Sequence, residues 1–243
     1  MRIADIPYEA DGRSMIGHLA FDDTRPGHRP AVLVSHEGPG LDQHARDIAE
    51  KLAALGYAAF ALDYNGDGRP LPQDQLMERI GALSADPERV GRLGRAGLDV
   101  LLAEAPADPG RVAAIGYCFG GVVSLELART GADLRAVVGF HPGYLPPRPA
   151  ESGSIRASVL MCSGTEDPFA TPEQRLGFEA EMREAGVADW RVELYGGVGH
   201  SFTNPEVDQY GMPGIAYDAL ADRRSWQSML QLFDEVLLAG PSQ

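Results

Sequence analysis

A cysteine between glycines is the residue of this sequence best suited to covalent chemistry. Cys118 lies in the hexapeptide GYCFGG at 116–121, with a glycine two positions before it and another two positions after it. An apolar run at 111–116 precedes it and a helical pattern at 121–130 follows, which predicts a sharp turn from a strand into a helix. Such a turn requires small neighbours and lifts the central side chain above the sheet edge. The amide groups and dipole of a helix N-terminus favour a thiolate, so the pattern predicts a nucleophilic thiol.

The two cysteines also allow other interpretations. Cys118 could be a small buried residue whose glycine neighbours only let a strand and a helix pack closely. A phosphate-binding loop is disfavoured, because the segment contains neither G-x-G-x-x-G nor G-K-[ST]. Cys162 lies at the end of the apolar segment 159–162, VLMC, and is predicted to belong to the core.

A thiol nucleophile needs a histidine to take its proton and a carboxylate to orient that histidine. In a strand-turn-helix architecture the chain order is nucleophile, acid, histidine. Asp167 and His200 have this order, and each follows its own predicted strand in a tight, glycine-containing loop. We therefore expect Cys118, Asp167 and His200 to form a catalytic triad. Glu166 is the alternative acid, expected to point to solvent, and His141 is the alternative base, although it precedes the acid in the chain.

The loop HEGPG at 36–40 ends the first long buried strand. In this architecture that loop donates one backbone N–H to an oxyanion hole, and the residue after the nucleophile donates a second. The candidates are the amides of Gly38 and Phe119. Glu37 is expected inside the site close to Cys118, where a carboxylate disfavours the thiolate, although a solvated loop glutamate is the plainer alternative. No metal site is predicted, because His36 and His44 have no third ligand at suitable spacing.

The elements that must position these residues alternate along the chain. Short strands are predicted at 2–8, 13–21, 31–35, 57–62, 111–116, 134–140, 157–162 and 190–195. Helices are predicted at 42–55, 73–105 with a break near Asp86-Pro87, 121–130, 172–185 and 215–239. Alternation predicts an α/β fold with a mostly parallel sheet of about eight strands, helices on both faces and an antiparallel edge at the N-terminus. The chemistry then gathers at the carboxyl ends of the strands, in a single domain over 1–243.

The composition and net charge disfavour nucleic-acid binding and membrane docking. The chain has 243 residues, 44% of them hydrophobic, a formal net charge of −14 and two cysteines. Such an acidic chain is atypical of nucleic-acid binders and of proteins that dock on anionic membranes. The longest nearly apolar stretch, residues 52–62, is about half of what a spanning helix needs, and the first residues lack a signal-peptide core. We expect a cytoplasmic protein that is a monomer or a small homo-oligomer and has no nucleic-acid or membrane partner.

Taken together, the motifs resemble the dienelactone hydrolase family of the α/β-hydrolase superfamily. The matching segments are His36-Glu37-Gly38, the hexapeptide 116–121, Gly164-Thr-Glu-Asp167 and Gly199-His-Ser-Phe202. The resemblance implies an α/β-hydrolase fold and cofactor-free hydrolysis of small carboxylic esters or lactones. It also implies that Cys118 acts with His200 and Asp167, and that Glu37 keeps the resting thiol unreactive until substrate arrives.

One departure from the family pattern concerns the substrate. Members bind a substrate carboxylate with arginines, one of them shortly after His-Ser-Phe, where this chain has Thr203-Asn204-Pro205. A second arginine is expected after the strand ending near Asp63, and Arg69 is nearby. An anionic dienelactone is therefore disfavoured as the substrate. By their place in strand-end loops, the candidate substrate-binding residues are Tyr64, Arg69, Tyr144 and Ser201.

Two other functions suit the same motifs. One is acyl transfer on the same scaffold, which an apolar lid that excludes water would favour. The other is a non-enzymatic role, in which Cys118 senses oxidants or the pocket only binds a ligand. A complete acid–histidine pair argues against the second role, because a sensor does not need one.

Overall fold

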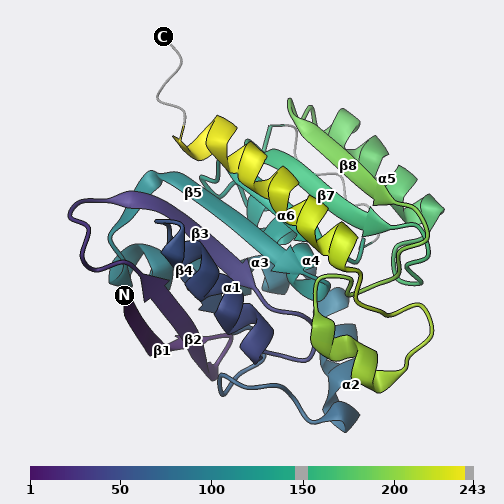
Figure 1. Cartoon of the computed structure of the whole chain (residues 1–243), viewed down its shortest axis with the longest axis horizontal. Coiled ribbons are helices and arrows are strands. Elements are labelled where there is room, and N and C mark those ends of the chain that lie inside the picture. The colour runs from purple at the N-terminus through teal and green to yellow at the C-terminus, as the bar shows by residue number, and fades with distance from the viewer. Residues whose placement is uncertain (146–152, 239–243) are drawn as a thin grey trace.

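The chain forms one eight-stranded sheet covered by helices on both faces (Figure 1). The computed structural model describes residues 1–145 and 153–238. The strands are β1 (Arg2–Ala10), β2 (Arg13–Phe21), β3 (Arg29–Ser35), β4 (Ala58–Leu62), β5 (Ala107–Tyr117), β6 (Ala136–Phe140), β7 (Ser158–Gly164) and β8 (Trp190–Tyr195). The α-helices are α1 (Gln43–Ala54), α2 (Gln73–Ser84), α3 (Pro87–Glu104), α4 (Phe119–Arg129), α5 (Pro172–Glu184) and α6 (Ala219–Phe233).

The sheet has the order β1-β2-β4-β3-β5-β6-β7-β8. Strands β3 to β8 run parallel to one another, whereas β2 pairs antiparallel with both β1 and β4, so that β1 and β2 form an antiparallel edge. The carboxyl ends of the parallel strands therefore meet at one edge of the sheet, where loops from β3, β5, β7 and β8 come together. The predicted α/β fold with a mostly parallel sheet is confirmed.

Two apolar cores lie on opposite faces of the sheet. Adjacent side chains of a strand point to opposite faces, so Leu33 packs in one core while Val32 and Val34 pack in the other. Helices α1 and α6 cover the second core, and α3 and α4 cover the first (Figure 1). Burial on both faces explains why β3 is apolar throughout its centre rather than alternating.

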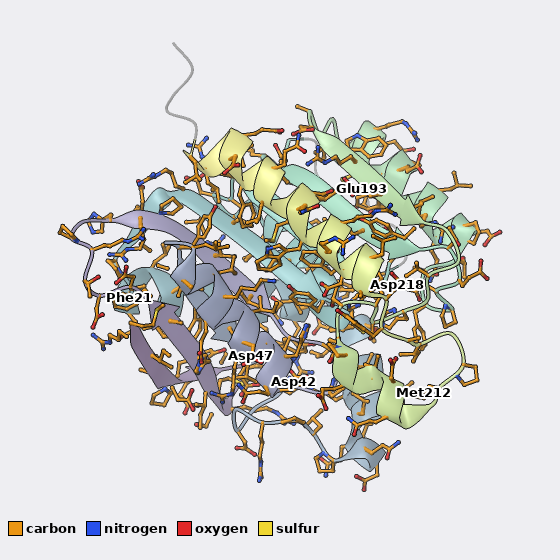
Figure 2. The ribbon with its side chains drawn as sticks, in the orientation of Figure 1. Phe21, Asp42, Asp47, Glu193, Met212 and Asp218 are labelled. Atoms are coloured by element: carbon orange, nitrogen blue, oxygen red, sulfur yellow. The ribbon has the colours of Figure 1, made fainter. Side chains whose placement is uncertain are left out.

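The predicted boundaries differ from the structure mainly near the C-terminus. The helix predicted for 215–239 begins only at Ala219, where Asp218 caps it by accepting hydrogen bonds from the backbone N–H groups of Leu220 and Ala221. Figure 2 shows Asp218 and Asp42, the N-cap residue of α1, at the starts of these two helices. The last turn, Asp234–Leu238, is π-helical, and residue 239 lies outside the described residues. A 3-10 helix at Pro205–Tyr210 was not predicted.

No helix in the described ranges combines the length and the apolar content needed to cross a bilayer.

Candidate active site

Cys118 is the single residue between β5 and α4. Its φ of 54° and ψ of −119° are strained for a residue with a side chain, and it is partly exposed. A Cβ added to Gly116 would lie 1.9 Å from the carbonyl oxygen of Gly120, and one added to Gly120 would lie 2.2 Å from that of Ser35. Both glycines are therefore sterically required by the turn. Cys162, in contrast, is completely buried in β7, and burial raises the pKa of its thiol.

His200 and Asp167 lie together at the ends of β8 and β7. His200 Nδ1 is 2.7 Å from Asp167 Oδ2, and both residues are buried. The other carboxylate oxygen of Asp167 accepts a hydrogen bond from the backbone N–H of Phe169. The two loops touch at Gly164, where a Cβ would lie 2.1 Å from the carbonyl oxygen of Val198. Glu166, the alternative acid, is exposed.

The electrostatics of His200 connect it to the thiol. Burial alone would lower the pKa of His200, but the charges of Cys118 and Asp167 and the hydrogen bond to Asp167 outweigh burial and raise that pKa well above its ordinary value. The second ring nitrogen, Nε2, is buried and has no geometric hydrogen-bond partner among the described residues. It is thus available to take a proton from a neighbouring thiol.

Glu37 is buried beside this pair and is held by the His200 loop. Its Oε2 accepts a hydrogen bond from Ser201 Oγ at 3.0 Å, and Asn204 Nδ2 lies 3.4 Å from its Oε1. No hydrogen bond joins Glu37 to Cys118 in the described part of the chain. Burial raises the pKa of Glu37, although His44 and His200 offset part of this effect. Asn204, which stands where the family arginine was expected, therefore contacts Glu37.

Replacing Glu37 with glutamine is expected to raise the melting temperature at pH 8. The raised pKa means that folding favours the protonated carboxyl, so the ionised form destabilises the native state as pH rises above the unfolded-state value. The neutral amide lacks this penalty. The gain should shrink toward pH 4, where the glutamate is itself protonated.

The matched control for this variant is Glu166→Gln, the same change at an exposed position. Thermal unfolding of both variants between pH 4 and pH 8 measures the difference. A Glu37→Gln protein that is less stable than wild type at pH 8 and equally stable at pH 4 would show that the carboxylate is favoured instead.

The predicted oxyanion donors come from two segments in contact. Phe119 is the first residue of α4, so its N–H has no partner within the helix. The Gly38 N–H belongs to the Glu37–Gly38 peptide, and the carbonyl of this peptide accepts a hydrogen bond from the Tyr64 hydroxyl at 3.0 Å. The close approach of Gly120 to the end of β3 brings the Gly38 loop beside the nucleophile turn. This arrangement is compatible with two N–H groups facing one oxygen.

The four candidate substrate-binding residues have different surroundings. Tyr64 is completely buried, and its hydroxyl donates to the carbonyls of His36 and Glu37. It therefore stabilises the loop that follows β3. Tyr144 is also buried, with its hydroxyl 3.0 Å from Ser163 Oγ. The Ser201 hydroxyl donates its hydrogen bond to the Glu37 carboxylate. Substrate contact by these three side chains would require their rearrangement.

Arg69 lines a surface pocket of about 440 Å³. Its side chain is 76% exposed. The described lining includes none of Cys118, Asp167, His200 or Glu37; its members are Arg13, Ser14, Asn65, Gly66, Asp67, Arg69, Pro70, Leu71, Pro72 and Gln75. The pocket that Arg69 lines is therefore not formed by the proposed catalytic residues.

Two neighbours of His200 were not predicted from the sequence. The Phe169 ring stands edge-on to the His200 ring with centroids 4.9 Å apart, and the residue is half exposed. Thr203 is buried and bonds to His141. Phe169 directly follows Asp167-Pro168, so its place in the same strand-end loop was the available signal. Thr203 lies in the loop that carries His200, but its partner His141 is distant in sequence, so their contact had no local signal.

Comparisons with known proteins bear on this geometry. The sequence model of the Dienelactone hydrolase family matches residues 16–237. The chain belongs to this family. The predicted family and the implied hydrolase class are thereby confirmed. In this member of the dienelactone hydrolase family, the strand order given above brings the strand-end loops to one edge of the sheet.

Two solved structures resemble this dienelactone hydrolase family member over nearly its whole length. One, named m3DLH, has a TM-score of 0.93 and 45% identity and covers 97% of this chain and 98% of its own. The other is a dienelactone hydrolase-like promiscuous phosphotriesterase from metagenomic libraries, with a TM-score of 0.92, 41% identity and the same coverage. A probable 2-oxo-3-(5-oxofuran-2-ylidene)propanoate lactonase of Bradyrhizobium sp is 27% identical over 234 residues, 90% of this chain and 89% of its own length.

Proposed function

We propose that this protein hydrolyses neutral carboxylic esters and lactones through an acyl-thioester on Cys118. The observation that carries the proposal is the His200–Asp167 hydrogen bond of 2.7 Å next to a cysteine held in a strained strand-to-helix turn. A cysteine with an oriented histidine is the arrangement that acyl transfer to a thiol requires. The names of family relatives, among them a lactonase, support the same reaction class.

The first half of the reaction forms the thioester. The thiol proton passes to His200 Nε2 while Sγ attacks the substrate carbonyl carbon. Asp167 holds the ring through Nδ1 and stabilises the imidazolium. The tetrahedral intermediate then collapses, its C–O bond to the leaving group breaks, and the leaving oxygen takes the proton back from His200.

The second half consumes water. His200 Nε2 takes a proton from a water molecule that attacks the thioester carbonyl. The C–S bond breaks, the carboxylic acid leaves, and the Cys118 thiol recovers its proton. In both halves of the proposed reaction the N–H groups of Gly38 and Phe119 stabilise the oxyanion, a contribution of about 3–4 kcal/mol for one oxyanion-hole donor.

Preference for a neutral substrate follows from the side chains around the site. Phe169 lies against His200, and Gly38 packs against Ile80 and Leu76 of α2. The position expected to hold a carboxylate-binding arginine is Asn204, and its amide is turned to Glu37. A substrate carboxylate would therefore lose its hydration without gaining a charged partner there.

The neutral preference predicts a measurable ratio. For two aryl esters of similar size, one neutral and one carrying a carboxylate on the acyl group, we expect kcat/KM to be at least about 10-fold higher for the neutral ester, since an unpaired charge in the site costs a few kcal/mol. Initial rates over a substrate series measure both values. Faster hydrolysis of the carboxylate ester, or none of either, would contradict the proposal.

A second activity, hydrolysis of neutral phosphotriesters, is favoured by the 41% identity to a promiscuous phosphotriesterase. In this chain the same thiolate would attack phosphorus and displace an aryloxide, and water would then cleave the P–S bond. Both activities would be lost together in a Cys118→Ala protein. Phosphotriester turnover that survives this substitution would separate the two.

A further inference from the structure

His141 lies between the nucleophile turn and the His200 loop and is completely buried. It directly follows β6 and has a φ of 40°, a left-handed backbone conformation that is uncommon for residues other than glycine. Its backbone N–H donates to the carbonyl of Cys162 at 2.7 Å, which anchors it to β7. A strained backbone at a buried polar residue indicates that the surroundings dictate where the imidazole lies.

Both ring nitrogens of His141 are occupied, each by a different part of the site. The backbone N–H of Cys118 is 3.2 Å from Nδ1 and is shared with the carbonyl of Phe140 at 3.0 Å. Nε2 is 2.9 Å from Thr203 Oγ1, on the loop that carries His200. One imidazole thus links the residue expected to attack with the loop expected to hold the base.

These contacts determine the tautomer of the ring. The Cys118 N–H can only donate, so Nδ1 of His141 accepts and carries no proton. The ring proton is then on Nε2, which donates to Thr203. A second proton on Nδ1 would break the contact with Cys118, so the bridge requires a neutral imidazole.

The surroundings keep the imidazole neutral. Burial, the largest cause, lowers the pKa of His141 well below its ordinary value, and the charges of His200 and His44 lower it further. The rings of His141 and His200 are 5.1 Å apart and nearly perpendicular. Tyr117 and Phe202 supply the other nearby rings. A neutral neighbour does not oppose the positive charge that His200 acquires when it takes the thiol proton.

We propose that His141 is a positioning residue that fixes the separation between Cys118 and His200, and that its imidazole stays neutral throughout the reaction. The inference rests on the function proposed above. His141 does not serve as the base, because neither of its nitrogens can accept the thiol proton without losing a contact. Its effect on the reaction is transmitted through the Cys118 backbone and the Thr203 side chain.

Two substitutions separate the two ends of the bridge. Thr203→Val removes the acceptor for Nε2 with little change in shape, and His141→Asn keeps an acceptor near Nδ1 but no longer reaches Thr203. We expect each to lower kcat by roughly 10- to 100-fold, the effect of a small misplacement of reacting groups, with KM changed less than about 3-fold. The double variant should be no slower than His141→Asn alone, because both changes break one bridge.

A second readout is alkylation of Cys118 by iodoacetamide as a function of pH, which needs no turnover. Loosening His200 should lower the alkylation rate in both variants, because the base that takes the thiol proton is held less firmly. Thr130→Val is the matched control: its hydroxyl bonds the Leu127 carbonyl at the far end of α4 from Cys118, and its profile should match wild type. Thermal unfolding identifies any variant that fails to fold. If His141→Asn does not fold, Thr203→Val alone tests whether the bridge positions the thiol and His200.

A Thr203→Val protein with wild-type kcat and a wild-type alkylation profile would overturn the inference. The proposed function fails by a different result, namely hydrolysis that persists in Cys118→Ala. Because alkylation is measured without substrate, the position of the thiol can be assessed in either case.

Discussion

Replacing Cys118 with alanine is expected to lower kcat/KM for ester hydrolysis by roughly 10⁴-fold or more, the loss seen when the nucleophile of a comparable triad is removed. The reason is that alanine cannot form the thioester, so water must attack the ester directly. Cys118 is the partly exposed thiol in the strained turn, whereas Cys162 is buried and cannot replace it there. Steady-state rates with a neutral aryl ester measure the loss.

Cys162→Ala is the matched control, because it removes the same sulfur from the interior of β7. It should lower thermal stability, since it leaves a small cavity in the core, but it should retain turnover. Loss of turnover in Cys162→Ala with retention in Cys118→Ala would move the chemistry to the other cysteine and contradict the assignment.

Replacing Asp167 with asparagine is expected to lower kcat by roughly 10³- to 10⁴-fold, as for the corresponding change in a serine–histidine–aspartate triad. The asparagine amide can donate a hydrogen bond to His200 Nδ1, and it then favours the tautomer whose Nε2 carries the proton and cannot accept one from the thiol. Asp167 also takes part in raising the pKa of His200, so the imidazolium becomes less stable without it. KM should change little.

The neighbouring Glu166→Gln variant separates the two acids. Glu166 is exposed, whereas Asp167 is buried and bonded to His200. Wild-type kcat is expected for Glu166→Gln. A large loss in that variant, with a small one in Asp167→Asn, would show that the acid had been assigned to the wrong residue.

The sequence carried enough local information to predict the turn around Cys118 and the chain order of the site. Glycines at 116 and 120 indicated a turn with no room for a Cβ, and the structure places backbone atoms within 2.2 Å of both Cβ positions. Alternation of strands and helices predicted which loops share an edge of the sheet. Asp167 and His200 were therefore predictable as neighbours before their hydrogen bond was seen.

Side-chain directions within those loops could not be predicted in the same way. Tyr64 follows β4, as a substrate-binding residue would, yet its ring points inward and supports the carbonyls of His36 and Glu37. Asn204 was noted for the arginine it replaces, and only the fold shows that it contacts Glu37. The bridge from His141 to Thr203 joins loops that are distant in sequence, so no local pattern encodes it. Such contacts depend on how loops from separate strands pack together.

The most direct test of the central claim is mass spectrometry of the intact protein after brief mixing with a neutral activated ester. His200→Ala slows hydrolysis of the thioester, so an adduct with the mass of the acyl group should accumulate on the peptide containing Cys118. The same mixture with Cys118→Ala should show none. Turnover by the wild-type protein without any adduct on Cys118, or an adduct on another residue that is formed and hydrolysed at the rate of turnover, would contradict the account.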